Sequence, residues 1–317
     1  MTSETFTRSN EPSIPETRPP HPGVSSASDA IDQRYYRPEL DWLRFMAFSA
    51  VFTNHVYWRE VQNHVHMEMS GILASAIVPL ARAGGYGVDL FFALSAFLIT
   101  KLLLLERERT GRIHIRSFYV RRTLRIWPLY FAFILAAFSI DKFFREVPVG
   151  YYAALFTFTG NWYGVFFEEI FLTIAAPLRS VCVEEQFYLV WPILVCRTKP
   201  ARFGVIMVAL LVFTCMYRTI YIYGLPPHSM SVWLNTFTRL DPFALGGLLA
   251  ILLHNRNVTL TRVYRGGALM AGIAMFWFLG VYGVTKANFP AAIWEQFTAS
   301  IWAFPLAAVA STLFLIA

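Results

Sequence analysis

Leu40-Asp-Trp-Leu-Arg44-Phe-Met-Ala-Phe-Ser-Ala-Val-Phe-Thr-Asn-His55 is the stretch that decides the fold, because it is an apolar segment carrying a cation and an imidazole. Arg44 and His55 are eleven positions apart. A helix turns about 100° per residue, so eleven residues end about 20° past three full turns, and both side chains lie on the same helix face. At about 1.5 Å per residue they lie roughly 16 Å apart, about half the thickness of a hydrocarbon layer. Two interpretations stay open: a site that runs through a membrane, or Arg44 snorkelling to one interface while His55 faces water at the other.

The composition predicts an all-α polytopic membrane protein. The chain has 317 residues, of which 56% are hydrophobic and 15% charged, whereas a soluble domain carries about 25% charged residues. Apolar runs predict spans near 40–58, 87–105, 123–140, 181–196, 203–223, 239–254, 266–284 and 293–317. We therefore expect about 8–10 transmembrane helices in a lipid bilayer.

One apolar region, 150–177, is interrupted by Gly160, Asn161, Gly164, Glu168 and Glu169. The spans on either side require it to cross the membrane an even number of times. A broken or re-entrant helix pair meets this requirement, and such backbone is tolerated at membrane depth only around a cavity or inside protein. An outward-facing cavity is the expectation here.

The basic residues of the loops set the expected orientation. They gather strongly on one side, above all in the 101–125 loop, which the positive-inside rule places in the cytoplasm together with the N-terminus. Arg44 then lies near the inner face and His55 near the outer one. Because the net charge of +7 is explained by orientation, we expect no nucleic-acid partner. The three cysteines show no metal-ligand spacing, so no metal is expected.

The domain organisation is simple. Residues 1–34 are rich in Pro, Ser, Thr and Glu and poor in large apolar residues, which predicts a disordered cytoplasmic tail. Residues 35–317 form one membrane domain. Because the chain stops at Ala317 inside an apolar run, either the last helix ends flush with the bilayer or the chain is truncated at its C-terminus.

Three charged groups besides Arg44 and His55 are candidates for chemistry. Arg121, Arg122 and Arg125 lie together at the cytoplasmic mouth of a span, where guanidinium forks suit phosphate oxygens, although topology alone also predicts cations there. Glu184 and Glu185 near the outer end of another span could orient a histidine, or form an ion pair with Arg179. The run Arg239-Leu-Asp241 to Gly246-Gly247 fits substrate binding or helix packing equally well.

Four segments together resemble acyltransferase family 3, a family of integral-membrane proteins. They are Leu40-Asp-Trp-Leu-Arg44 to His55, Gly87-Val-Asp89-Leu-Phe-Phe-Ala-Leu-Ser95-Ala-Phe-Leu, Phe118-Tyr-Val-Arg-Arg-Thr-Leu-Arg-Ile-Trp-Pro128, and Ser180-Val-Cys-Val-Glu184-Glu-Gln-Phe-Tyr-Leu-Val-Trp-Pro192. The resemblance covers roughly residues 36–317. The chain departs from the family pattern at Trp42, Ala96 and Arg179, which bears on the pocket's shape and hence on the substrate.

The resemblance implies that an acyl group, often acetyl, passes from cytoplasmic acyl-coenzyme A to a hydroxyl, in an inner (plasma) membrane of bacterial type. The acceptor is a glycan, a lipid-linked sugar or a small hydroxylated molecule, and acyl-coenzyme A is a co-substrate rather than a bound cofactor. The family's arginine–histidine pattern falls on Arg44 and His55, its paired arginines on Arg122 and Arg125, and its outer glutamate on Glu184.

The mechanistic hypothesis follows from these positions. Arg122 and Arg125, with Arg121, hold the donor's phosphates, Arg44 lines the donor's path, and His55 is the general base. Glu184 or Asp89 is expected to set the tautomer of His55. A transporter or flippase of a polar lipid or glycan is the alternative, since the same residue types line transport paths. Interrupted helices paired in two related halves of the chain would favour the transporter. The sequence shows one interrupted region without a matching partner, which favours the enzyme. A non-catalytic scaffold is the third option.

Overall fold

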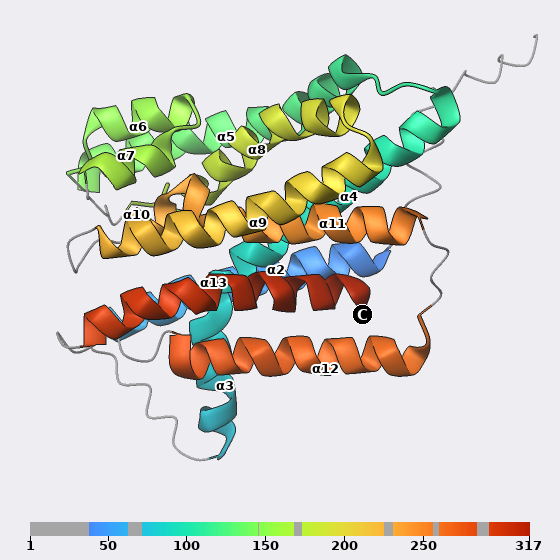
Figure 1. Cartoon of the computed structure of the whole chain (residues 1–317). Coiled ribbons are helices and arrows are strands. Elements are labelled where there is room, and N and C mark those ends of the chain that lie inside the picture. The colour runs from blue at the N-terminus through green and yellow to red at the C-terminus, as the bar shows by residue number, and fades with distance from the viewer. Residues whose placement is uncertain are drawn as a thin grey trace, which may run out of the picture. The chain divides into compact units, whose positions relative to one another are not determined.

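The computed structural model describes residues 38–62, 72–144, 146–167, 173–224, 231–255, 260–283 and 292–317. The expected tail, 1–34, lies outside them. Within the described residues the chain is helical and contains no strand. The elements are α2 (Pro38–Gln62), α3 (Ile72–Ala83), η1 (Gly84–Tyr86), α4 (Gly87–Thr110), α5 (Ile115–Phe144), α6 (Val149–Phe156), α7 (Gly160–Phe167), α8 (Leu178–Arg197), α9 (Pro200–Tyr223), α10 (Ser231–Leu234), η2 (Thr236–Arg239), α11 (Asp241–Asn255), α12 (Arg262–Phe278), the π-helical η3 (Leu279–Gly283) and α13 (Ala292–Ile316) (Figure 1).

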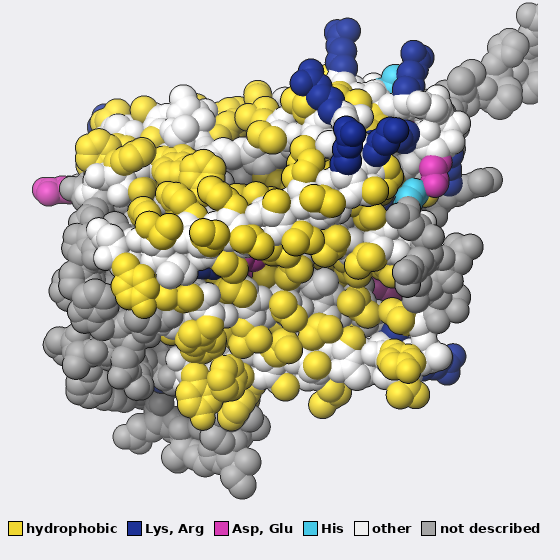
Figure 2. All heavy atoms as spheres, in the orientation of Figure 1, with side chains coloured by type: hydrophobic (Ala, Val, Ile, Leu, Met, Phe, Trp, Pro, Cys, Tyr) yellow, Lys and Arg dark blue, Asp and Glu magenta, His cyan; other side chains and the backbone are white. Residues whose placement is uncertain are grey.

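The expected fold class is confirmed. Each predicted span falls on a helix, and among the described residues five helical segments are long and apolar enough to cross a membrane: 77–110, 115–144, 200–223, 262–282 and 299–316. Large apolar side chains stay exposed along these helices, among them Leu124, Val205 and Met270, and they cover much of the face shown in Figure 2. The protein is therefore an integral membrane protein. The spans on α2 and α8 carry more charge, and α11 is shorter; α2 holds Arg44 and His55, and α8 holds Glu184.

Helix α4 lies at the centre of the bundle, packed against α2, α8, α11 and α13. Figure 1 shows α5–α8 on one side of α4 and α12 and α13 on the other. Small residues permit the closest approaches. A Cβ on Gly246 of α11 would lie 2.2 Å from the carbonyl oxygen of Ala93 on α4. Close helix packing through small residues is the usual solution in membranes, so the packing interpretation of Gly246 holds.

The interrupted region forms two short helices, α6 and α7, of eight residues each. Eight residues span about 12 Å, less than half of a hydrocarbon layer, so neither helix crosses it. Phe158 joins them in a left-handed conformation with φ 55°, which costs energy for a residue with a side chain. Its ring stacks on Tyr130 and its carbonyl accepts a hydrogen bond from Gln186. These contacts offset the strain. Glu168 and Glu169 lie outside the described residues.

Sequence reasoning missed α3 as an element. Its twelve residues are too few to read as a span, and Pro79 lies inside it. It continues through η1 into α4, so that residues 77–110 form one long apolar segment. Asn54 near the end of α2 contacts the last turn of this short helix.

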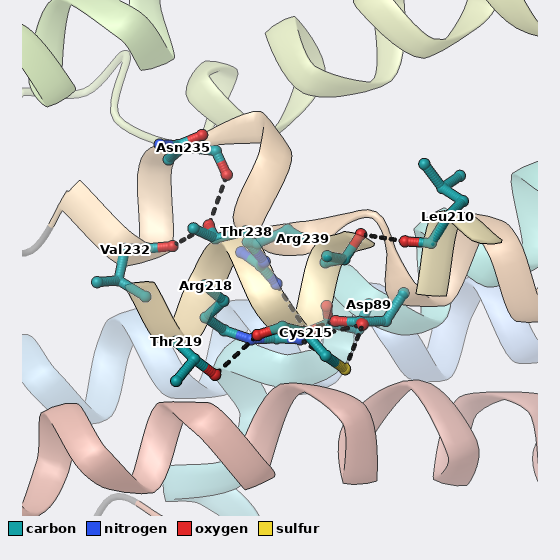
Figure 3. A network of polar contacts seen from close by, with 11 residues as sticks. Asp89, Leu210, Cys215, Arg218, Thr219, Val232, Asn235, Thr238 and Arg239 are labelled. Atoms are coloured by element: carbon teal, nitrogen blue, oxygen red, sulfur yellow. Dashed lines mark hydrogen bonds and ion pairs between the residues drawn. The ribbon is translucent and has the colours of Figure 1, made fainter. Parts of the chain in front are cut away.

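Two aspartates and two arginines form a buried charge tetrad between four elements (Figure 3). Arg239 of η2 donates to Asp89 of α4 at 2.7 Å. Arg218 of α9 donates two hydrogen bonds to Asp241 of α11, at 2.7 and 3.0 Å. The exposed fraction of these side chains is 0 to 7%. Because isolated charges are costly in a medium of low polarity, each charge requires its partner.

We predict that Arg218→Ala destabilises the fold by about 3–5 kcal/mol, because it leaves Asp241 buried without its bidentate partner. Thermal unfolding in detergent micelles measures the change. Arg202→Ala, which removes an exposed cation from the same helix, is the matched control and should change stability by less than about 0.5 kcal/mol. Equal unfolding temperatures for the two variants would contradict a structural role for the tetrad.

Candidate active site

His55 lies exposed on α2 with its ring fixed by its own helix. The ring nitrogen Nδ1 is 2.8 Å from the carbonyl oxygen of Val51, one turn earlier. A carbonyl oxygen accepts hydrogen bonds and does not donate them, so the proton must be on Nδ1 for this contact to be attractive. In the neutral ring, Nε2 then carries the free lone pair. This is the tautomer that a general base needs.

Asn54, the neighbour of His55, fixes this end of α2. Its side chain is 8% exposed, and its amide donates to the carbonyl oxygens of Ala81 and Arg82 at the end of α3. These two hydrogen bonds occupy carbonyls that the end of a helix leaves free. Asn54 therefore faces inward, and His55, one step further around the helix, faces outward.

Arg44 lies at the other end of the same helix face. It forms an ion pair with Asp41 at 2.5 Å, three residues earlier, and both side chains are nearly half exposed, at 40% and 47%. An exposed pair of this kind contributes about 0–1 kcal/mol. Arg44 can therefore exchange Asp41 for another anion at little cost.

Glu184 belongs to a polar cluster inside the bundle. Ser95 of α4 contacts Glu184 Oε1 at 3.4 Å and the Tyr188 hydroxyl at 3.0 Å, and that hydroxyl donates to Glu184 Oε2 at 3.1 Å. Ser95 and Glu184 are partly exposed, whereas their chain neighbours Leu94 and Val183 are buried. The cluster is thus polar and accessible at one point of an otherwise apolar interior.

The structure separates the three arginines of α5. Arg122 is partly buried, and its guanidinium carbon lies 3.6 Å from the centre of the Tyr188 ring. Arg121 and Arg125 are exposed, and Figure 2 shows Lys and Arg side chains gathered at one end of the molecule. The sequence-based expectation that Arg122 and Arg125 act as one pair does not match this arrangement.

Asp89 and Glu184 have partners other than His55. Asp89 is bound to Arg239 in the charge tetrad, and Glu184 to Ser95 and Tyr188. The carbonyl of Val51 performs the task that sequence reasoning gave to these carboxylates. The charged run around Arg239 and Asp241 serves helix packing.

Arg179 has a different partner from the expected glutamate: its Nε donates to the carbonyl of Ala176 at 3.1 Å. The second carboxylate, Glu185, accepts from the indole of Trp127 at 3.1 Å. The alternative of an Arg179 ion pair with Glu184 or Glu185 is therefore replaced by separate local partners.

Gln186 organises a hydrogen-bond network that sequence reasoning missed. Its amide donates to Asn161 Oδ1 at 2.9 Å, and its carbonyl oxygen accepts from Thr236 at 2.7 Å. Asn161 is fully buried and donates in turn to Thr236 at 3.0 Å. Asn161 thus joins α7 to η2 and does not line an open cavity. A polar residue in an apolar run broken by glycines was the sequence signal for Asn161. No sequence feature indicated its partner Thr236, which lies 75 residues away.

Comparison with known proteins identifies the family. Residues 37–317 match the family described as an acyltransferase domain. The chain therefore belongs to this family, acyltransferase family 3, as its sequence motifs indicated. No solved structure matches the chain.

Curated relatives are named O-acetyltransferases of Listeria monocytogenes and Staphylococcus aureus. Over 169 residues the chain is 30% identical to the peptidoglycan O-acetyltransferase OatA of Listeria monocytogenes. This alignment covers 50% of this chain and 24% of that protein. The chain is 31% identical over 185 residues to a putative O-acetyltransferase of Staphylococcus aureus (strain COL), covering 53% and 30%. It is 30% identical over 187 residues to the O-acetyltransferase OatA of Staphylococcus aureus (strain NCTC 8325), covering 54% and 30%. The chain thus spans less than a third of the length of these relatives.

We predict that His55 carries its proton on Nδ1 in the neutral protein, because the Val51 carbonyl accepts from that nitrogen. ¹⁵N spectra of protein labelled at histidine, recorded above neutral pH, distinguish the two tautomers. The chain has seven histidines, so the His55 signals are assigned as those that disappear in a His55→Gln variant. Assignment of His55 to the Nε2–H tautomer would contradict the hydrogen bond to Val51.

Proposed function

We propose that the protein is a membrane-bound O-acyltransferase that moves an acyl group, in the first instance acetyl, from acyl-coenzyme A to a hydroxyl of a carbohydrate-type acceptor. The family membership supports acyl transfer, and the names of the relatives support acetyl as the group and a hydroxyl as its acceptor. One observation supports His55 as the catalytic residue: its ring is exposed, and the Val51 carbonyl accepts from Nδ1, which leaves Nε2 free.

His55 is the proposed general base. Its Nε2 takes the proton of the acceptor hydroxyl, whose oxygen attacks the acyl carbonyl carbon of the donor. The bond to the thiol sulfur then breaks, and the thiolate takes a proton to leave as free coenzyme A. Positioned proton transfer of this kind contributes about 10²–10⁴-fold to a rate.

The donor's phosphates are proposed to bind the arginines at the basic end of the molecule. Arg121 and Arg125 are exposed there, on the helix that follows the α4–α5 turn. Guanidinium groups bind phosphate oxygens through paired, charge-assisted hydrogen bonds. Arg44, whose pair with Asp41 is exposed, is proposed to line the path from this end toward His55.

The acceptor is proposed to be a glycan, a lipid-linked sugar or a small hydroxylated molecule on the outer side. One relative is named for its action on peptidoglycan, which makes a cell-surface glycan the first acceptor to test. The exposure of His55 supports access of a polar acceptor to its ring.

We predict that His55→Ala lowers acyl transfer about 10²-fold or more, because the acceptor hydroxyl loses its base. Thiol release from acetyl-coenzyme A, measured with purified protein in proteoliposomes with and without a glycan acceptor, gives the rate. Thr53→Ala, another exposed position on α2, is the control and should keep the rate. A correctly inserted His55→Ala protein that still transfers the acyl group would exclude His55 as the base.

The proposed orientation places the N-terminus and the α4–α5 turn in the cytoplasm, since exposed cations gather at that end. We predict that a cysteine replacing Glu146, which is exposed beyond α5, reacts with a membrane-impermeant maleimide in intact cells. A cysteine replacing Arg112 in the α4–α5 turn should react only after permeabilisation. The parent protein, with its own cysteines, gives the background, and the opposite labelling pattern would reverse the orientation.

A further inference from the structure

The ring of Tyr188 fixes Arg122 inside the bundle. The guanidinium carbon lies 3.6 Å from the ring centre, a stacking distance at which the positive charge interacts with the face of the ring. The Nε atom of Arg122 is buried and has no hydrogen-bond partner among the described residues. A buried, unsatisfied guanidinium nitrogen is costly, so stacking on Tyr188 is the contact that keeps Arg122 in this position.

The hydroxyl of Tyr188 fixes Glu184 at the same place. It donates to Glu184 at 3.1 Å and lies 3.0 Å from the Ser95 hydroxyl, which also reaches Glu184. One side chain, 2% exposed, therefore holds a cation with its ring and a carboxylate with its oxygen. The charge of Arg122 in turn acts on both Glu184 and Glu185.

Arg121 and Arg125 form a different pair. They are four residues apart on α5, so they differ by about 40° around the axis and are surface neighbours. Both are exposed. Like charges at this spacing repel each other, and an anion bound between them relieves the repulsion. Arg122 lies about 60° beyond Arg125 around the axis, on the side away from Arg121, and contacts Tyr188 of α8.

We propose that Tyr188 is a positioning residue that divides the arginine group of α5. It fixes Arg122 beside Glu184 inside the bundle, on the donor's path toward His55, and it thereby leaves Arg121 and Arg125 as the pair that binds the donor's phosphates. The inference rests on the proposed function, because it assigns the residues of one arginine group to two different roles toward the same donor.

The experiment separates binding from turnover. Binding of coenzyme A to the purified protein in nanodiscs is measured by titration calorimetry, and acyl transfer is measured in the same preparation. Arg125→Ala should weaken coenzyme A binding about tenfold or more, since it removes a charge-assisted contact. Tyr188→Leu should leave coenzyme A binding within about twofold of the parent while turnover falls about tenfold or more. Arg116→Ala, exposed on another face of α5, is the control for charge alone.

A double-mutant cycle tests the coupling between Tyr188 and Arg122. Once Tyr188→Leu has released Arg122, adding Arg122→Ala should cause little further loss of turnover, whereas adding Arg125→Ala should multiply the two effects. Tyr188→Phe keeps the ring and loses the hydroxyl, so it should lose less turnover than Tyr188→Leu. If the Tyr188→Leu protein does not fold, Tyr188→Phe takes its place in the experiment.

The outcomes distinguish the two levels of the proposal. A parent protein that neither binds coenzyme A nor transfers an acyl group would overturn the proposed function itself. A parent protein that does both, with a Tyr188→Leu or Tyr188→Phe variant that weakens coenzyme A binding as strongly as Arg125→Ala, would overturn the division of the arginines. Independent effects of Tyr188 and Arg122 in the cycle would overturn it as well.

Discussion

The buried charge tetrad is the constraint on which the rest of the bundle depends. In a helical membrane protein the cost of a lone buried charge limits where each helix can lie, and here two arginines must each meet an aspartate from another element. Asp89 is in the first turn of α4, so its pair with Arg239 fixes the start of the central helix. The glycines just before it in the chain, Gly84, Gly85 and Gly87, are those against which α2 packs. The tetrad therefore determines where α2 is held.

The glycine contacts define how α2 and α4 are aligned. Gly87 meets Ala47, whereas Gly84, earlier on the chain, meets Ala50 and Asn54, later on α2. The two helices therefore run in opposite directions. His55 lies eight residues beyond Ala47, and Ser95 lies eight residues beyond Gly87, about 12 Å each way. The base and the Tyr188 cluster are thus roughly 24 Å apart in depth. In the proposed reaction the donor must therefore extend past the Tyr188 cluster to bring its acyl group to His55.

The sequence predicted the parts of the fold that depend on local pattern. Each apolar run became a helix, and the glycine-broken run became the α6–α7 pair, because length and periodicity alone determine these features. The pairing of charges could not be predicted. Asp89 meets Arg239 150 residues later, and a single sequence contains no information about which of several cations approaches a given carboxylate. The expectation that Asp89 serves His55 failed for this reason, whereas the contact of His55 with Val51, four residues away, follows from helix geometry.

Burial and partner number separate the structural charges of this protein from those available for chemistry. Arg218 is fully buried and its two terminal nitrogens are both bound to Asp241, so no ligand can replace that partner without exposing a charge to a medium of low polarity. Arg44 has one partner, and the pair is nearly half exposed. Exchanging Asp41 for an anionic donor changes little in solvation, which makes the exchange possible at equilibrium. Arg122 is intermediate, held by the face of an aromatic ring instead of an anion. A ring can fix a cation without taking up its hydrogen-bond donors, so this contact does not commit the guanidinium nitrogens of Arg122 to a fixed anion.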